Sequence, residues 1–163
     1  MILRHEKSSF VPSAWVFPGG AVDFEDGPAG TLDTLQRAAL REVLEETGVR
    51  LTGELVLTSR WITPAGLPKR FDTWFFLAAA PADVVIKLQE EEAVDFLWIA
   101  PSEAIARNAA GNLPMVFPTI RNLEALLPFE SVSGLMDTRR SAVVDPVQPV
   151  LVVEDGKKRI RLP

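Results

Sequence analysis

Apolar residues change their spacing along the chain, and these changes predict where strands and helices lie. Short apolar runs bounded by glycine or proline predict strands at 2–4, 14–17, 55–62, 70–78 and 94–99. Leucines at helical spacing predict a helix that starts with Thr31 as a capping residue and stops at Gly48. The core face of that helix is expected to carry Leu32, Leu35, Ala39, Val43 and Leu40, with its carboxylates on the opposite side.

The second half of the chain predicts two further helices and a terminal hairpin. One helix is expected at 101–108 with Ser102 as its cap, and another at 118–127. Asp155-Gly156 between β-rich runs predicts the hairpin. This mixture gives an α/β (α+β) class. A chain of 163 residues suits one domain, 1–163, with a C-terminal extension from about residue 131.

Three glutamates are expected on one face of the first helix. Glu42, Glu45 and Glu46 are spaced i, i+3 and i+4, so their side chains meet within one turn. Three like charges repel one another there, which favours a neutralising cation. Carboxylate oxygens suit Mg²⁺ or Mn²⁺.

A glycine turn precedes this helix. Residues 15–20 read Trp-Val-Phe-Pro-Gly-Gly, a strand that runs into a turn at Gly19 and Gly20. Backbone oxygens and amides at that turn are candidates to reach both a metal ion and a phosphate.

Together these segments resemble the Nudix hydrolase family. Its signature is Gly-x5-Glu-x7-Arg-Glu-U-x-Glu-Glu-x-Gly-U, where U is aliphatic. Residues 41–49 supply the whole second half of this signature: Arg41, Glu42, Val43, Glu45, Glu46, Gly48 and Val49. The resemblance implies an α/β/α sandwich with a mixed central sheet, and hydrolysis of a diphosphate linkage in a nucleoside-diphosphate-type substrate.

The first half of the signature departs from the pattern. Arg41 follows Gly20 by 21 positions where the pattern has 14, so seven residues are added. Counting back from Arg41 places Asp33 at the first glutamate and Gly27 at the first glycine. We favour a mixed register, in which Gly19 and Gly20 form the turn, Asp33 opens the helix and 24–31 is a lengthened loop.

The resemblance also implies roles for individual residues. Glu42 and Glu46 are the expected metal ligands, and Glu45 is a third ligand or the partner of Arg41. A backbone carbonyl at Gly19 or Gly20 would complete the metal shell. Arg41 is expected to hold the helix against the glycine loop rather than to contact phosphate.

An additional acid from a later loop is the expected ligand or general base. Residues 90–92 are all glutamate, and Glu92 is favoured over Glu91 by its distance from Trp98. A solvated acidic turn is the alternative interpretation of this run.

Substrate recognition is assigned to cations beside aromatic residues. Arg60 and Arg70 are the candidates for substrate phosphates, and Trp61 is a candidate to stack on a base, although a core role suits it equally. The lengthened glycine-to-helix loop is similar to that of peroxisomal coenzyme A diphosphatases, which suggests coenzyme A or acyl-coenzyme A. The coenzyme-A-type motif before Phe17 is absent, so ADP-ribose and other nucleotide sugars stay open.

Composition narrows the classes of partner. A net charge of −5 argues against a nucleic-acid surface. No cysteine is present, which excludes disulfides and thiolate metal sites, and no apolar run reaches the length of a membrane span. These features fit a cytoplasmic protein with a small-molecule diphosphate substrate and no membrane partner.

One strand that family members usually carry before residues 2–4 is missing here. An internal start, a reduced fold or a sheet completed by a second subunit would each explain this, and the last makes a homodimer an expected assembly. The added loop, Asp33 and the missing strand also favour an alternative function. The chain would then be a catalytically silent Nudix module that binds a nucleotide ligand or mediates assembly.

Overall fold

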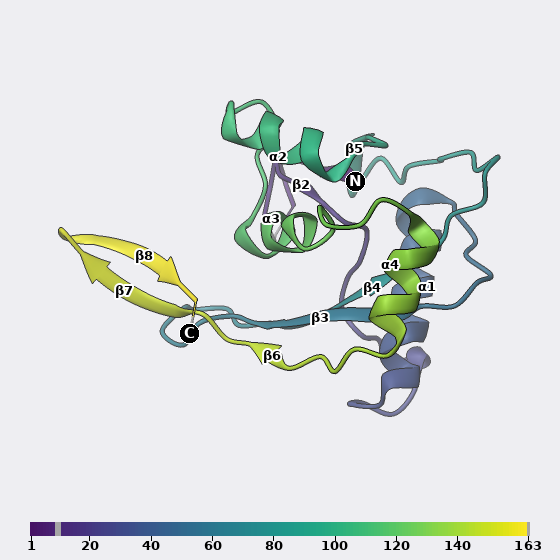
Figure 1. The fold of residues 1–163 in the computed structure, drawn as a ribbon, viewed down its shortest axis with the longest axis horizontal. Coiled ribbons are helices and arrows are strands. Elements are labelled where there is room, and N and C mark those ends of the chain that lie inside the picture. The colour runs from purple at the N-terminus through teal and green to yellow at the C-terminus, as the bar shows by residue number, and fades with distance from the viewer. Residues whose placement is uncertain (9–10, 163) are drawn as a thin grey trace. The chain divides into compact units, whose positions relative to one another are not determined.

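A computed structural model describes residues 1–8 and 11–162 (Figure 1). The chain forms two compact units. The first comprises Met1–Glu54 and Ala78–Leu135, and the second comprises Leu55–Leu77 with the chain from Met136 onward. Helices and strands are mixed, so the expected α/β class is confirmed.

The first unit contains a small antiparallel sheet, one 3-10 helix and three complete α-helices. Its sheet has the order β2-β1-β5, so β1 is paired on both sides. The elements of this unit, in chain order, are β1 (Ile2–Arg4), β2 (Trp15–Val16), the 3-10 helix η1 (Phe24–Asp26), α1 (Leu32–Thr47), β5 (Ala93–Phe96), α2 (Pro101–Ala109) and α3 (Phe117–Glu124). The strands and helices predicted for these regions are present.

Two buried clusters form the core of this unit. One joins the sheet to the helices and contains Trp15, Ala104, Leu113 and Leu123. The other lies within the sheet and contains Ile2, Val16 and Ala93. Both clusters include residues of β2, so the strand that leads into the glycine turn is anchored by apolar packing.

Helix α1 begins and ends as the sequence predicts, but the residues that it buries differ from the predicted ones. The Thr31 hydroxyl accepts the amide hydrogen of Thr34, and Gly48 ends the helix in the left-handed conformation with φ 70°. Leu32 is 47% exposed, so the prediction that it faces the core was wrong. The buried residues of α1 are Thr34, Ala38, Glu46 and Thr47. A carboxylate therefore lies on the inner face, where the sequence pattern placed leucines.

The later helices differ from expectation at their ends. Helix α2 begins at Pro101 with Ala100 as its N-cap, and no side chain caps it, so Ser102 does not have the predicted role. Proline at this first position needs no hydrogen-bond partner for its nitrogen. Helix α4 (Val132–Arg140) was not predicted, because residues 131–141 carry few apolar side chains at helical spacing.

The second unit is built from strands. Strands β3 (Val56–Ile62) and β4 (Asp72–Leu77) pair antiparallel as expected, and β6 (Pro146–Val147) pairs parallel with β3. Strands β7 (Val150–Glu154) and β8 (Lys157–Arg161) form the predicted hairpin. Its turn residues Asp155 and Gly156 have φ 53° and 72°, which is the conformation that Asp-Gly favours.

We expect Leu123→Ala to lower the free energy of unfolding by about 2–5 kcal/mol, because Leu123 is 3% exposed in the helix–sheet cluster. Leu127→Ala is the matched control, since Leu127 is 50% exposed. Urea unfolding followed by tryptophan fluorescence measures both. Equal effects of the two substitutions would contradict the packing described here.

Candidate active site

Glu46 is the most buried carboxylate of the first unit, at 1% exposure. It lies in the last turn of α1 and points toward the glycine turn. Its Oε2 accepts the amide hydrogen of Gly19 at 2.8 Å, and its Oε1 lies 3.5 Å from Nη1 of Arg4. The glycine turn and the end of the helix, expected to meet, are therefore joined by a hydrogen bond to a side chain.

Burial raises the pKa of Glu46 to about 7. The Gly19 amide and the Arg4 charge oppose this rise, whereas the negative charges of Glu42 and Glu92 add to it. A carboxylate with these neighbours is costly to keep ionised without more positive charge.

Glu42 lies against the other glycine of the turn. A Cβ atom at Gly20 would overlap the Glu42 carboxylate, so only glycine leaves room for this side chain. Glu42 and Glu46 are one helical turn apart, and each therefore contacts one residue of the Gly19-Gly20 pair.

The segment before β5 brings Glu92 to the same place. Lys87 and Gln89 donate backbone hydrogen bonds to the carbonyls of Thr47 and Glu46, which satisfies the open end of α1. Glu92 is partly buried, whereas Glu90 and Glu91 are exposed. Its charge acts on Glu46, which places the favoured acid of the three near the helix carboxylates.

Arg41 is the centre of an ion-pair network. Its Nε and Nη2 bind both oxygens of Asp26 at 3.0 and 2.9 Å, and Nη2 also donates to the Ala21 carbonyl at 2.9 Å. Its Nη1 lies 2.9 Å from oxygens of both Glu42 and Glu45. Arg41 thus joins the helix to the glycine loop, as the sequence interpretation proposed.

The acid that pairs with Arg41 from outside α1 is Asp26, and Asp33 does not pair with it. Asp26 is 4% exposed and lies in η1, which a capping box with Asp23 holds in place. Asp33 instead pairs with Arg37 on the outer face of α1, so the register that gave Asp33 the first-glutamate position was wrong. Residues 24–26 of the predicted loop 24–31 form η1, and residues 27–31 connect η1 to α1.

The sequence contained the signal for Asp26. Five residues separate Gly20 from Asp26, the spacing of the signature's first glycine and glutamate. Counting forward from Gly20, rather than back from Arg41, finds it. The added residues then fall between Asp26 and Arg41.

The donor set fits a small divalent cation. Within residues 1–8 and 11–162, no group of three or more acidic or histidine side chains is arranged to hold a metal alone. Mg²⁺ is commonly held by one or two carboxylates with water and substrate oxygens. Glu42 and Glu46 supply two such carboxylates beside a backbone turn, and Glu45 is half exposed and paired with Arg41.

The three side chains predicted to bind substrate lie in the second unit, whereas Gly19 and Gly20 lie in the first. Arg60 is held by both oxygens of Asp72, at 2.8 and 2.6 Å, and stacks on Trp74 at 4.5 Å from the ring centre. Arg70 donates to the Thr63 carbonyl, and Trp61 is 8% exposed. Their substrate roles stay predictions.

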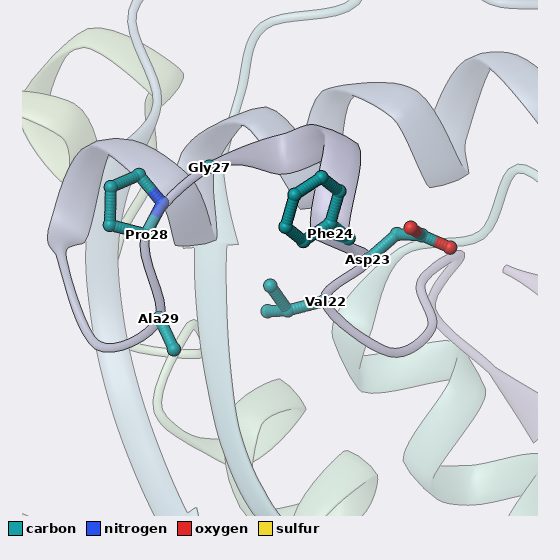
Figure 2. Close-up of a pocket in the computed structure, with 6 residues that line it drawn as sticks. All are labelled: Val22, Asp23, Phe24, Gly27, Pro28 and Ala29. Carbon is teal, nitrogen blue, oxygen red and sulfur yellow. The ribbon is translucent and has the colours of Figure 1, made fainter.

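An open hollow of about 590 Å³ lies beside the glycine turn, along residues 22–29. Figure 2 shows the side chains of Val22, Phe24, Pro28 and Ala29 around it, with the Asp23 carboxylate turned away. Phe24 is 94% exposed although the Asp23–Asp26 capping box fixes its backbone. The hollow is therefore an apolar surface on an ordered segment.

None of the described helices has the length and apolarity needed to cross a membrane.

The Asp26–Arg41 pair predicts a pH-dependent loss of stability. Hydrogen bonding from Arg41 lowers the pKa of Asp26 below its ordinary value of 3.8. The pair therefore stabilises the folded state above that value, and this contribution is lost as pH falls through the lowered pKa. We expect Asp26→Asn to lower the melting temperature near about pH 7 and to converge with the parent protein at acid pH.

Asp33→Asn is the matched control for this experiment, because Asp33 is 75% exposed and its pair with Arg37 lies on the surface. Its melting curve should follow that of the parent protein at every pH. A larger effect at Asp33 than at Asp26 would restore the register counted back from Arg41.

Comparison with known proteins gives the family. The NUDIX domain model matches residues 1–117. A Caenorhabditis elegans protein described as "Putative nudix hydrolase 7" is 29% identical over 162 residues, covering 77% of this chain and 54% of that relative, so the chain spans about half its length. The crystal structure of a NUDIX hydrolase from Alicyclobacillus acidocaldarius superimposes with a TM-score of 0.75 at 26% identity, covering 87% of this chain and 88% of that one. The chain belongs to the NUDIX domain family.

Proposed function

We propose that this chain is a divalent-metal-dependent hydrolase that cleaves a diphosphate linkage in a small nucleoside-diphosphate-type substrate. The observation that carries the proposal is that Glu42 and Glu46 lie against the Gly19-Gly20 turn, with Glu92 close enough for its charge to act on Glu46. A mutually repelling set of acids around the buried Glu46 has little structural value, but it suits a cation and a charged substrate.

Each acid has a distinct part in the proposed reaction. Glu42 and Glu46 would hold the cation, which would neutralise phosphate charge and polarise the phosphorus centre. Glu92 accepts a proton from the attacking water as its oxygen bonds to phosphorus. The bridging P–O bond then breaks, and the leaving phosphate departs with the bond's electron pair. Glu45 and Arg41 position Glu42 rather than contact substrate.

The silent-module alternative loses part of its support. It rested on the added residues, on the replacement of the first glutamate by aspartate at position 33, and on the missing first strand. Asp26 nevertheless makes the double hydrogen bond to Arg41, so the shorter side chain keeps the link between loop and helix. Ligand binding without turnover would favour the module.

Coenzyme A or an acyl-coenzyme A is the proposed substrate class. The apolar hollow at residues 22–29 follows directly on the glycine turn, where an apolar arm attached to a bound diphosphate would lie. ADP-ribose carries no such arm. Mg²⁺ and Mn²⁺ are both proposed as the cation, and a homodimer is the proposed assembly.

Glu46→Gln should abolish most turnover while the protein stays folded. The test measures phosphate release from coenzyme A, acyl-coenzyme A, ADP-ribose and dinucleoside polyphosphates, with Mg²⁺ or Mn²⁺ and a coupled phosphatase. We expect a loss of at least about 100-fold, since losing even an indirect partner of a metal costs about 10- to 100-fold. Glu103→Gln, which alters an exposed ion pair on α2, is the control. Unchanged turnover in Glu46→Gln would remove this residue from the mechanism.

Gly20→Ala is expected to lower turnover without lowering the stability of the fold. The new methyl group would displace the Glu42 carboxylate, the flexible end of a side chain, so the melting temperature should change little. Turnover should fall by about tenfold or more, because a ligand moves from its position. Gly53→Ala is the matched control, since a Cβ there meets nothing within 4 Å. Equal turnover in both variants would contradict the placement of Glu42.

A further inference from the structure

Arg4 is a partly buried arginine whose backbone is fixed on two sides. Its amide donates to the Ala14 carbonyl at 3.0 Å toward β2, and it pairs with Ala93 in β5. The register between β1 and β5 shifts between Leu3 and Arg4. Such irregularities redirect a side chain out of the normal alternation of a strand. Here the side chain reaches the buried end of α1.

The guanidinium of Arg4 is held in place by hydrogen bonds, but not all of its nitrogens have a partner among the described residues. Nε donates to the Ser8 hydroxyl at 3.1 Å, and Nη1 makes the 3.5 Å contact with Glu46. Among the described residues, Nη2 has no partner within hydrogen-bonding distance, and the side chain is 14% exposed. The Nη1 contact is at the long limit for a hydrogen bond.

Arg41 presents the opposite situation. All three of its nitrogens are bound, to Asp26, to the Ala21 carbonyl and to two glutamates of its own helix. Its donors are therefore committed to holding the loop. Of these two arginines near Glu46 and Glu42, Arg4 has donors left for a ligand.

We propose that Arg4 binds the substrate, donating from its Nη1 and Nη2 to two non-bridging oxygens of the diphosphate. This inference rests on the proposed function. A cation held by Glu42 and Glu46 would take up their negative charge and weaken the attraction that Glu46 exerts on Arg4. An anionic phosphate arriving with that cation supplies a new partner, and a planar guanidinium can bind phosphate through two parallel hydrogen bonds. Because Ser8 and two neighbouring strands already order Arg4, little conformational entropy is lost on binding.

A binding experiment tests this assignment without requiring turnover. Methylenediphosphonate, a diphosphate analogue with a P–C–P bridge, is titrated into the protein in saturating Mg²⁺ and followed by calorimetry. We expect Arg4→Met to weaken binding by about tenfold or more, as for the loss of a charge-assisted hydrogen bond. Arg4→Lys keeps the charge beside Glu46 but replaces the planar guanidinium, with its two parallel donors, by a single ammonium group. This variant should weaken binding by about threefold or more. Arg50→Met, at an exposed position just after α1, should bind as the parent protein does.

Mn²⁺ binding without the diphosphonate distinguishes this role from a purely structural one. If Arg4 only positioned Glu46, its loss would weaken Mn²⁺ binding. We expect Mn²⁺, followed by electron paramagnetic resonance, to bind Arg4→Met as tightly as the parent protein or more tightly, because a nearby positive charge has been removed.

Two results would overturn the inference. One is parent-like diphosphonate affinity in Arg4→Met, or in Arg4→Lys if the methionine variant does not fold. The other is a loss of Mn²⁺ affinity that accounts for the whole effect. A parent protein that binds no diphosphonate in Mg²⁺ would instead overturn the proposed function itself, so the two failures are distinguishable.

Discussion

The burial of the Glu46 carboxylate constrains everything around it in the first unit. A charged group at 1% exposure needs partners, and the chain provides them from two separate segments, the Gly19 amide after β2 and Arg4 in β1. A third segment, at residues 87–89, binds the carbonyls of the same helical turn. Three parts of the chain therefore meet at the end of α1, and the raised pKa of Glu46 shows that their compensation is partial.

The Asp26–Arg41 pair fixes the other end of the glycine loop. It allows the loop to be lengthened without disturbing the carboxylates, because the added residues lie after Asp26, outside the segment between Gly20 and Asp26. The same pairing keeps η1 ordered while Phe24 stays exposed. One segment thus combines a rigid link to α1 with an exposed apolar surface.

Arginine has separate structural tasks at different places in this chain. Arg41 has its donors bound within the network, and Arg60 is held by Asp72 and stacked on Trp74. The sequence suggested Arg60 as a phosphate ligand because a cation stood beside aromatics. Arg60 contacts Asp72 and Trp74 because it lies on β3 and they lie on β4, the strand that pairs with β3. Nothing in the sequence marks Arg4 in this way, because Leu3 and His5 flank it and no Trp or Phe stands beside it.

The sequence by itself determined the features that depend on local spacing. Capping, turn chemistry and helical periodicity act over a few residues, so the sequence alone determined the strand that leads into the glycine turn, both ends of α1, the Asp-Gly hairpin and the acids of residues 41–49. Tertiary structure decided which acid pairs with Arg41, which face of α1 is buried and how Arg4 meets Glu46. Each of these depends on contacts between residues 15 to 42 positions apart, where hydrogen-bond geometry and burial select one partner among those that the sequence offers.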